Sequence, residues 1–131
     1  MIIMEILLLL GRIVFGGFFI MSGINHFTNA GMMAGYSASK NVPAAPVAVV
    51  LTGVMLVAGG LSVVLGFLPI LGLLLLIVFL VPTSVLMHNF WTVQDPQFRA
   101  AEQINFLKNM ALTGAALALM YGAADWPLAI S

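Results

Sequence analysis

Four long runs of apolar residues, separated by more polar segments, dominate the hydrophobic pattern of the chain. Each run is close to the roughly 20 residues with which a helix crosses about 30 Å of hydrocarbon. Lipid offers no hydrogen-bond partners, so each span is predicted to be a helix, which pairs its own backbone groups. The predicted helices cover about residues 6–24, 47–66, 70–88 and 104–122. As one domain over residues 1–131, they predict an all-α, integral membrane four-helix transmembrane bundle.

The composition agrees with this pattern and excludes several functions. Hydrophobic residues make up 63% and charged residues 6% of the chain, whereas soluble domains carry about 25% charged residues. The lipid bilayer is therefore its predicted surroundings. Nucleic acid is excluded as a partner, because four basic and four acidic residues form no basic surface. The chain has no cysteine, so a redox role would need a bound cofactor or a partner protein.

The connections between the spans differ sharply in length. A tight turn near residues 67–69 joins the second and third spans, whereas the connections over residues 25–46 and 89–103 are long and polar. Alternating spans place both long connections on one side of the membrane, together with His26 and His88 at the span ends. We therefore expect a working site on this side, called the loop side. Counting basic residues places it in the cytoplasm, although nearby acidic residues weaken this assignment.

Glycines recur in the first, second and fourth spans, where they are predicted to let helix backbones approach closely. These are Gly16, Gly23, Gly53, Gly59, Gly60, Gly114 and Gly122. The same close-packing residues in so small a bundle make the chain a candidate homo-oligomer.

The fourth span begins with a polar stripe. Its residues recur at spacings of three and four, which puts them on one helical face: Asn105, Lys108, Asn109 and Thr113. A charged residue well inside the bilayer costs at least about 2 to 3 kcal/mol, so the stripe is predicted to face the bundle interior. The alternative is that Lys108 only extends to the headgroups, but Asn109 is too short for that.

Arg12 and Trp91 each carry two interpretations. Arg12 is either an interhelical clamp, bonded to backbone carbonyls or to a polar residue at its depth, or a positive charge that holds an anionic or quinone-like headgroup. Trp91 is either an interfacial anchor or part of the site. Pro82 removes one helical hydrogen bond, and a kink there is predicted to tilt His88 and Trp91 inward over the mouth of the bundle.

His26 and His88 are also candidate haem or metal ligands, because imidazole is a common ligand. Their positions at helix ends fix no ligand geometry, and no further His or Cys completes a tetrahedral site. Haem is therefore disfavoured and no metal site is predicted.

Four short motifs give the chain a family resemblance. They are SGINHF at Ser22–Phe27, NVPAAP at Asn41–Pro46, HNFW at His88–Trp91 and FLKN at Phe106–Asn109. With these motifs, the chain resembles the DoxX family from Arg12 to Gly122. The resemblance implies a small four-helix membrane protein in the cell (inner) membrane of a prokaryote. It also implies a link to membrane oxidoreductase assemblies, since relatives include a subunit of thiosulfate:quinone oxidoreductase and a partner of a superoxide dismutase and a sulfurtransferase.

The resemblance also assigns candidate residues. Those that correspond to recurring polar positions of the family are Arg12, His26, His88, Trp91, Lys108 and Asn109. Many relatives carry a glutamate in the second helix where this chain has Met55. A pairing of that glutamate with Arg12, if the family uses one, is therefore absent here.

Two functions follow from these residues. The first is a membrane subunit of a redox or oxidative-stress system that binds a quinone-like molecule. There His88 and Lys108 would hydrogen-bond its oxygens, Trp91 would pack on its ring and Asn109 would orient Lys108. The second is a noncatalytic scaffold whose loop side docks a soluble partner enzyme. Transport is a third and weaker hypothesis, because Arg12 and Lys108 are the only candidate groups within the spans.

Overall fold

The computed structural model describes residues 1–130, and these residues form helices and turns without a strand. The elements are α1 (Ile2–Thr28), α2 (Ala30–Ser39), α3 (Ala45–Leu65), α4 (Pro69–Met87), η1 (Phe90–Thr92), α5 (Pro96–Leu119) and η2 (Ala123–Asp125). Three of them, α1, α3 and α4 with the turn through Thr92, are long and apolar enough to cross a membrane. The predicted all-α membrane bundle is therefore confirmed, with α5 as a fourth and more polar long helix.

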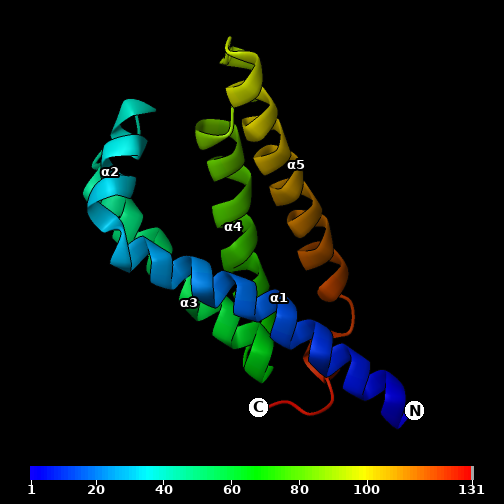
Figure 1. Cartoon of the computed structure of the whole chain (residues 1–131). Helices are drawn as coiled ribbons and strands as arrows, with labels where there is room; N and C mark the ends of the chain where they lie inside the picture. Colours follow the sequence, from blue (N-terminus) through cyan, green and yellow to red (C-terminus); the bar gives the residue numbers. More distant parts are fainter. Residues whose placement is uncertain (131) are drawn as a thin grey trace.

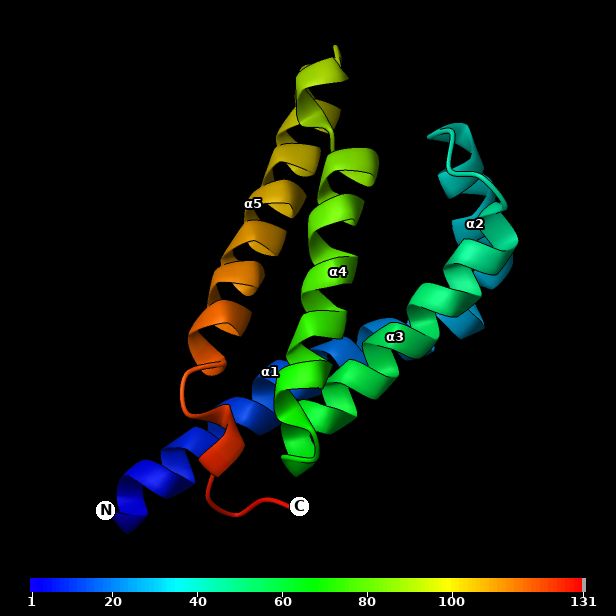
Figure 2. The ribbon, with the colours of Figure 1, turned by 180° about the vertical axis from the view of Figure 1, so that it is seen from behind.

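The four long helices are arranged as two pairs (Figures 1 and 2). Helix α1 packs along α3, α4 follows α3 through the tight turn, and α5 runs beside α4. The two pairs cross obliquely, and α2 packs against α3 at the same end as the beginning of α5. Both chain ends lie at the opposite end. The long connections thus share one side of the molecule.

Two helical segments extend into regions that the hydrophobic pattern treated as connections. The connection over residues 25–46 contains the last turn of α1 and all of α2. Helix α5 begins at Pro96, eight residues before the predicted start at 104. Asp95 caps it, since one side-chain oxygen accepts a hydrogen bond from the backbone N–H of Phe98 (3.4 Å). Capping residues and proline at a helix start favour helix without raising hydropathy.

Glycine contacts hold α1 against α3. A Cβ atom placed on Gly16 would lie 2.6 Å from the carbonyl oxygen of Gly60, and one on Gly23 would lie 2.7 Å from that of Gly53. The prediction of close packing is confirmed for these spans. In the fourth helix, however, a Cβ on Gly114 would meet nothing within 4 Å, because α5 contacts α4 and makes no comparable contact with α1.

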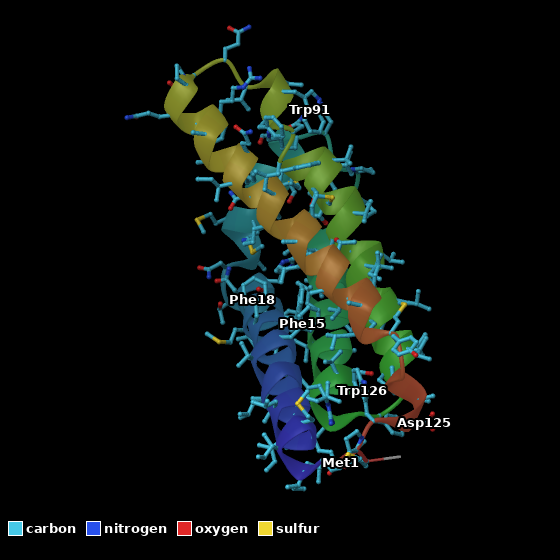
Figure 3. The ribbon with its side chains drawn as sticks, turned by 90° about the vertical axis from the view of Figure 1, so that its right-hand side faces the viewer. Met1, Phe15, Phe18, Trp91, Asp125 and Trp126 are labelled. Atoms are coloured by element: carbon cyan, nitrogen blue, oxygen red, sulfur yellow. The ribbon has the colours of Figure 1, made fainter. Side chains whose placement is uncertain are left out.

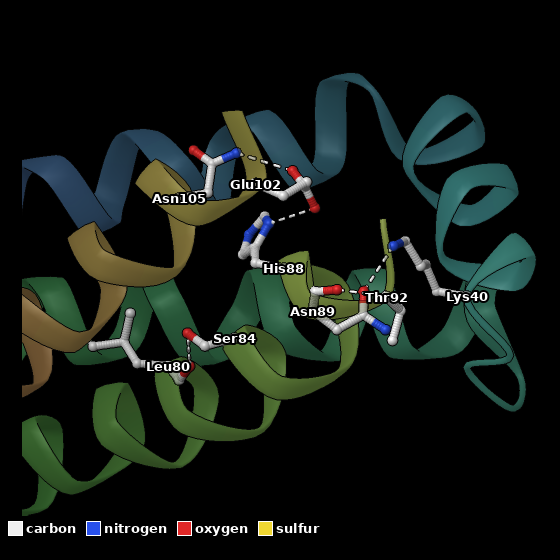
Figure 4. Close-up of polar contacts among 8 residues, drawn as sticks. All are labelled: Lys40, Leu80, Ser84, His88, Asn89, Thr92, Glu102 and Asn105. Atoms are coloured by element: carbon white, nitrogen blue, oxygen red, sulfur yellow. Dashed lines mark hydrogen bonds and ion pairs between the residues drawn. The ribbon is translucent and has the colours of Figure 1, made fainter. Parts of the chain in front are cut away.

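Helix α4 runs through Pro82 as one continuous element from Pro69 to Met87. The hydroxyl of Ser84 donates to the backbone carbonyl of Leu80 (2.7 Å), which is the bond that Figure 4 draws within this helix. His88 directly follows Met87, the last residue of α4, and is the C-terminal cap of this helix.

Candidate ligand-binding site

Two adjoining cavities lie at the loop side of the bundle. The apolar cavity, about 450 Å³, lies between α2, α3 and α4, and its most apolar side chains are Val49, Met55, Val78, Leu86 and Met87. The polar cavity, about 320 Å³, lies between α1, α4 and α5. Its polar side chains include Ser22, Asn25, Lys108 and Asn109. Both volumes lie within or near the range of small-molecule sites, about 300 to 1,000 Å³.

The two cavities share one wall. It consists of His26, Met33, Phe79, Thr83 and His88, which line both cavities. The rings of His26 and Phe79 meet edge to face with centroids 5.8 Å apart. Both histidines that the sequence singled out therefore belong to the site, although they come from different helices.

Hydrogen bonds fix the ring of His26. Its Nδ1 atom lies 3.0 Å from the backbone carbonyl oxygen of Val49 and 3.1 Å from the hydroxyl oxygen of Thr52. The Thr52 hydroxyl itself donates to the carbonyl of Ala48 (2.7 Å). A carbonyl oxygen only accepts hydrogen bonds, so the proton of the His26 ring belongs on Nδ1. The Nε2 atom of a neutral His26 is then left as an acceptor.

His88 joins α4 to α5 (Figure 4). Its Nδ1 atom lies 3.2 Å from a carboxylate oxygen of Glu102, whose other oxygen accepts a hydrogen bond from the Asn105 side chain (3.2 Å). Glu102 is buried, with 5% of its surface exposed. The carboxylate accepts a hydrogen bond from Nδ1 and so fixes the orientation of the His88 ring in the common wall.

The long connections meet above this wall. The ammonium of Lys40 donates to the side-chain oxygen of Asn89 (2.9 Å), which joins the end of α2 to the beginning of η1. Burial raises the pKa of the Tyr36 phenol, and the nearby carboxylate of Glu102 raises it further. Tyr36 also lines the apolar cavity. The end of α2 is therefore tied to η1, and Tyr36 on α2 lies close enough to α5 for the Glu102 carboxylate to act on its phenol.

This arrangement gives a prediction for the ionisation of Tyr36. In a Tyr121→Phe background, where Tyr36 is the remaining tyrosine, we expect Glu102→Gln to lower the pKa of Tyr36. The pKa should stay above the ordinary value of a phenol, because burial persists. The absorbance of the phenolate during an alkaline titration measures it. Asp95→Asn is the matched control, and an unchanged titration in Glu102→Gln would show that this carboxylate does not act on Tyr36.

Lys108 and Asn109 occupy the α5 side of the polar cavity. The Lys108 ammonium lies 5.7 Å from the ring centroid of Phe18 on α1. Asn109 is buried, with 6% of its surface exposed. Within residues 1–130 its side-chain amide makes no hydrogen bond, although its backbone carbonyl accepts one from Thr113 (2.8 Å). The predicted polar stripe is therefore buried at Asn109, whereas Lys108 is exposed and lines the edge of the polar cavity.

Trp91 and Arg12 lie outside both cavities, and Figure 3 shows Trp91 at one end of the molecule and Trp126 near the other. Trp91 is 48% exposed and packs edge to face on Phe90 and Phe106. Arg12 is fully buried, and its guanidinium lies 5.1 Å from the Trp126 ring centroid. The structure thus gathers His26, His88, Lys108 and Asn109 and leaves Trp91 and Arg12 apart.

Several lining residues carried no signal in the sequence. Phe79 is one of many large apolar residues in its span, and Tyr36 lies in a segment predicted to be a connection. Glu102 lines neither cavity and lies in a segment predicted to be a polar connection, yet it is buried against His88. Candidate metal ligands do not gather here, since within residues 1–130 no three His, Cys, Asp or Glu side chains form a group.

A bundle of membrane helices that encloses two cavities with histidines in their common wall defines a small multi-pass membrane protein with a ligand-sized interior. The chain belongs to the DoxX family, whose model matches residues 7–89 and so covers most of α1 and all of α2, α3 and α4. The FLKN motif of α5 lies beyond the matched region. No curated protein and no solved structure shows significant similarity to this chain.

Proposed function

We propose that this DoxX-family protein binds a quinone-like small molecule in the two cavities and serves as the membrane component of a redox or oxidative-stress system. The observation that carries the proposal is the common wall, where His26 and His88 lie between an apolar cavity and a cavity lined by Lys108 and the buried Asn109. Ligand sites of this kind combine apolar walls with a few convergent polar groups.

The chemistry of a quinone fits these groups. Its ring is apolar, and its oxygens accept hydrogen bonds and become more negative on reduction. Lys108 and the Asn109 amide are donors for such oxygens, with the His88 ring beside them in the common wall, and donors stabilise the charge best where water is excluded. The acceptor Nε2 of a neutral His26 suits a hydroxyl of the reduced form.

The aromatic contact to the ring is assigned to Phe79 in this proposal. Phe79 lines both cavities and lies against His26, whereas Trp91 lines neither. Because the chain has no cysteine, electrons for the ligand would come from a partner, such as a soluble redox enzyme docked at the loop side.

Native mass spectrometry of protein extracted gently from its own membrane tests the proposal. We expect the wild type to retain or take up a quinone, and Lys108→Met and His88→Ala to lose it, because each variant removes a hydrogen-bonding side chain from the lining of the polar cavity. Losing one such hydrogen bond costs about 1 to 3 kcal/mol, which weakens binding by about tenfold or more.

Lys40→Met is the matched control, since Lys40 lines neither cavity and bonds to Asn89 instead. It should retain the quinone. If the wild type carries only bulk phospholipid and added quinone leaves its spectrum unchanged, the quinone proposal fails and a noncatalytic docking scaffold becomes the better account.

A further inference from the structure

The two cavities differ in chemistry although they share a wall. Lys108, Asn109, Ser22 and Asn25 line only the polar cavity. The side chains confined to the other cavity are mostly aliphatic or thioether groups, such as Val78 and Met87. A single compact polar molecule would leave one of these environments unmatched, whereas a molecule with a polar head and an apolar tail matches both.

Asn109 indicates which of the two cavities binds the polar head of such a molecule. Its side chain is 94% buried, as its exposed fraction is 6%. It lines the polar cavity, and its amide has no hydrogen-bond partner within residues 1–130. Within residues 1–130 no wholly buried side-chain nitrogen or oxygen lacks a partner, so the Asn109 amide reaches the space of the polar cavity, where a bound donor or acceptor can pair with it. Lys108, one residue earlier, adds a positive charge to the same cavity.

The apolar cavity is open towards the hydrocarbon. Val78 and Leu86 on α4 line it and are 59% and 50% exposed, respectively. Both belong to a helix that is apolar enough to span the membrane. A tail in this cavity can therefore continue past these side chains into the bilayer, and an amphiphile can enter from the lipid without crossing the polar loops.

We infer that the site takes one membrane-soluble amphiphile, with an oxygenated ring as its head at Lys108 and Asn109 in the polar cavity and a hydrocarbon tail in the apolar cavity. The molecule passes the wall at Phe79 and His26. This inference rests on the proposed function, to which it adds the substrate class and the direction in which the ligand lies. An anionic phospholipid offers similar oxygen acceptors, but it carries two acyl chains that would both have to leave through the adjoining apolar cavity of about 450 Å³.

The test compares two probes, a tailless methoxybenzoquinone and the same ring carrying a decyl chain, titrated against the full chain in native mass spectrometry. Ala48→Phe fills the apolar cavity from α3, and Ala58→Phe is its control on the lipid-exposed face of the same helix. We expect Ala48→Phe to weaken binding of the decyl probe by about tenfold or more, because the phenylalanine ring occupies the space that the chain would take. The tailless probe should bind Ala48→Phe and Ala58→Phe as it binds the wild type.

Asn109→Leu tests whether the head of the ligand lies in the polar cavity. It should weaken both probes by about tenfold, since each loses the same hydrogen bond. Excess anionic phospholipid should leave the bound decyl probe in place. If Ala48→Phe fails to fold, Met55→Phe fills the same cavity.

The outcomes separate this inference from the proposed function. If the wild type binds neither probe, the proposed function itself fails. If the wild type binds the tailless probe but Ala48→Phe weakens both probes equally or neither, the assignment of the tail is overturned while ring binding stands. Displacement of the decyl probe by phospholipid would overturn the substrate class in favour of a lipid.

Discussion

Replacing Arg12 by Met is expected to destabilise the bundle strongly and to release the residues after η2. The guanidinium of Arg12 donates four hydrogen bonds to backbone carbonyls, those of Val63 (3.1 Å), Val64 (2.9 Å), Pro127 (2.8 Å) and Leu128 (3.2 Å). It thereby joins α1, the end of α3 and the C-terminal segment. Carbonyls at a helix end carry partial negative charge, so a buried cation beside them is favourable.

Arg12→Met leaves these carbonyls without their donor inside the bundle. Hydrogen bonds to a charged group contribute about 1.5 to 3 kcal/mol each, and water near the membrane surface replaces part of the loss. We therefore expect a net cost of about 2 to 4 kcal/mol. Arg12→Lys should recover little, because one ammonium cannot reproduce the fork of the guanidinium.

Unfolding of purified protein in mixed micelles, followed as denaturing detergent is added, measures this cost. Limited proteolysis reports the release of the C-terminal segment. Arg99→Met is the matched control, since Arg99 is exposed on α5, and it should leave both measurements unchanged. Equal stability of the Arg12 and Arg99 variants would show that the clamp contributes little.

The second large loss of stability is expected for a substitution at Gly16, and its neighbour Gly17 provides the control. A Cβ on Gly16 would lie 2.6 Å from the carbonyl oxygen of Gly60 and 2.6 Å from a side-chain carbon of Val64, whereas a Cβ on Gly17 would meet nothing within 4 Å. Gly16→Ala must therefore push α1 away from α3. We expect this substitution to lower the free energy of unfolding by about 1 to 3 kcal/mol, as overpacking of a core does. It should also disturb the contact between α1 and α3, across which His26 is held.

Gly17→Ala serves as the control with the same chemical change one residue away. Alanine favours helix over glycine by about 1 kcal/mol, so this variant should be as stable as the wild type or slightly more stable. The same detergent titration measures both variants. Similar losses in the two would contradict a close approach of α1 and α3 at Gly16.

The fold could largely be predicted from the sequence, because a segment that crosses lipid has to form its backbone hydrogen bonds within itself. A run such as Leu73–Ile77 in a polar-poor chain has to be helical, and glycines at Gly16 and Gly60 signal close packing. Helix α2 and the early start of α5 were missed, since their helical turns depend on local capping and tertiary contacts rather than on hydropathy. The resemblance to the family, carried by short motifs, was confirmed over residues 7–89.

The site was accessible only in part. His26, His88, Lys108 and Asn109 stand out because polar residues are rare in such a chain, and the structure gathers them around two cavities. Their partners did not stand out, since the burial of Glu102 depends on how α5 meets α4. For Trp91 the sequence left open an interfacial anchor and a place in the site, and in the structure its ring packs on Phe90 and Phe106 and lines neither cavity.

Photolabelling tests the central claim most directly, namely that a quinone-like ligand occupies the two cavities. A photoreactive benzoquinone would be added to the wild-type protein in membranes, and the labelled peptides would be mapped by mass spectrometry. The account predicts labels concentrated on the α4 segment from Phe79 to His88 and around His26, which excess unlabelled quinone removes. Labels spread over lipid-facing side chains such as Val14 and Met21, 74% and 73% exposed, without enrichment at the wall, would contradict it.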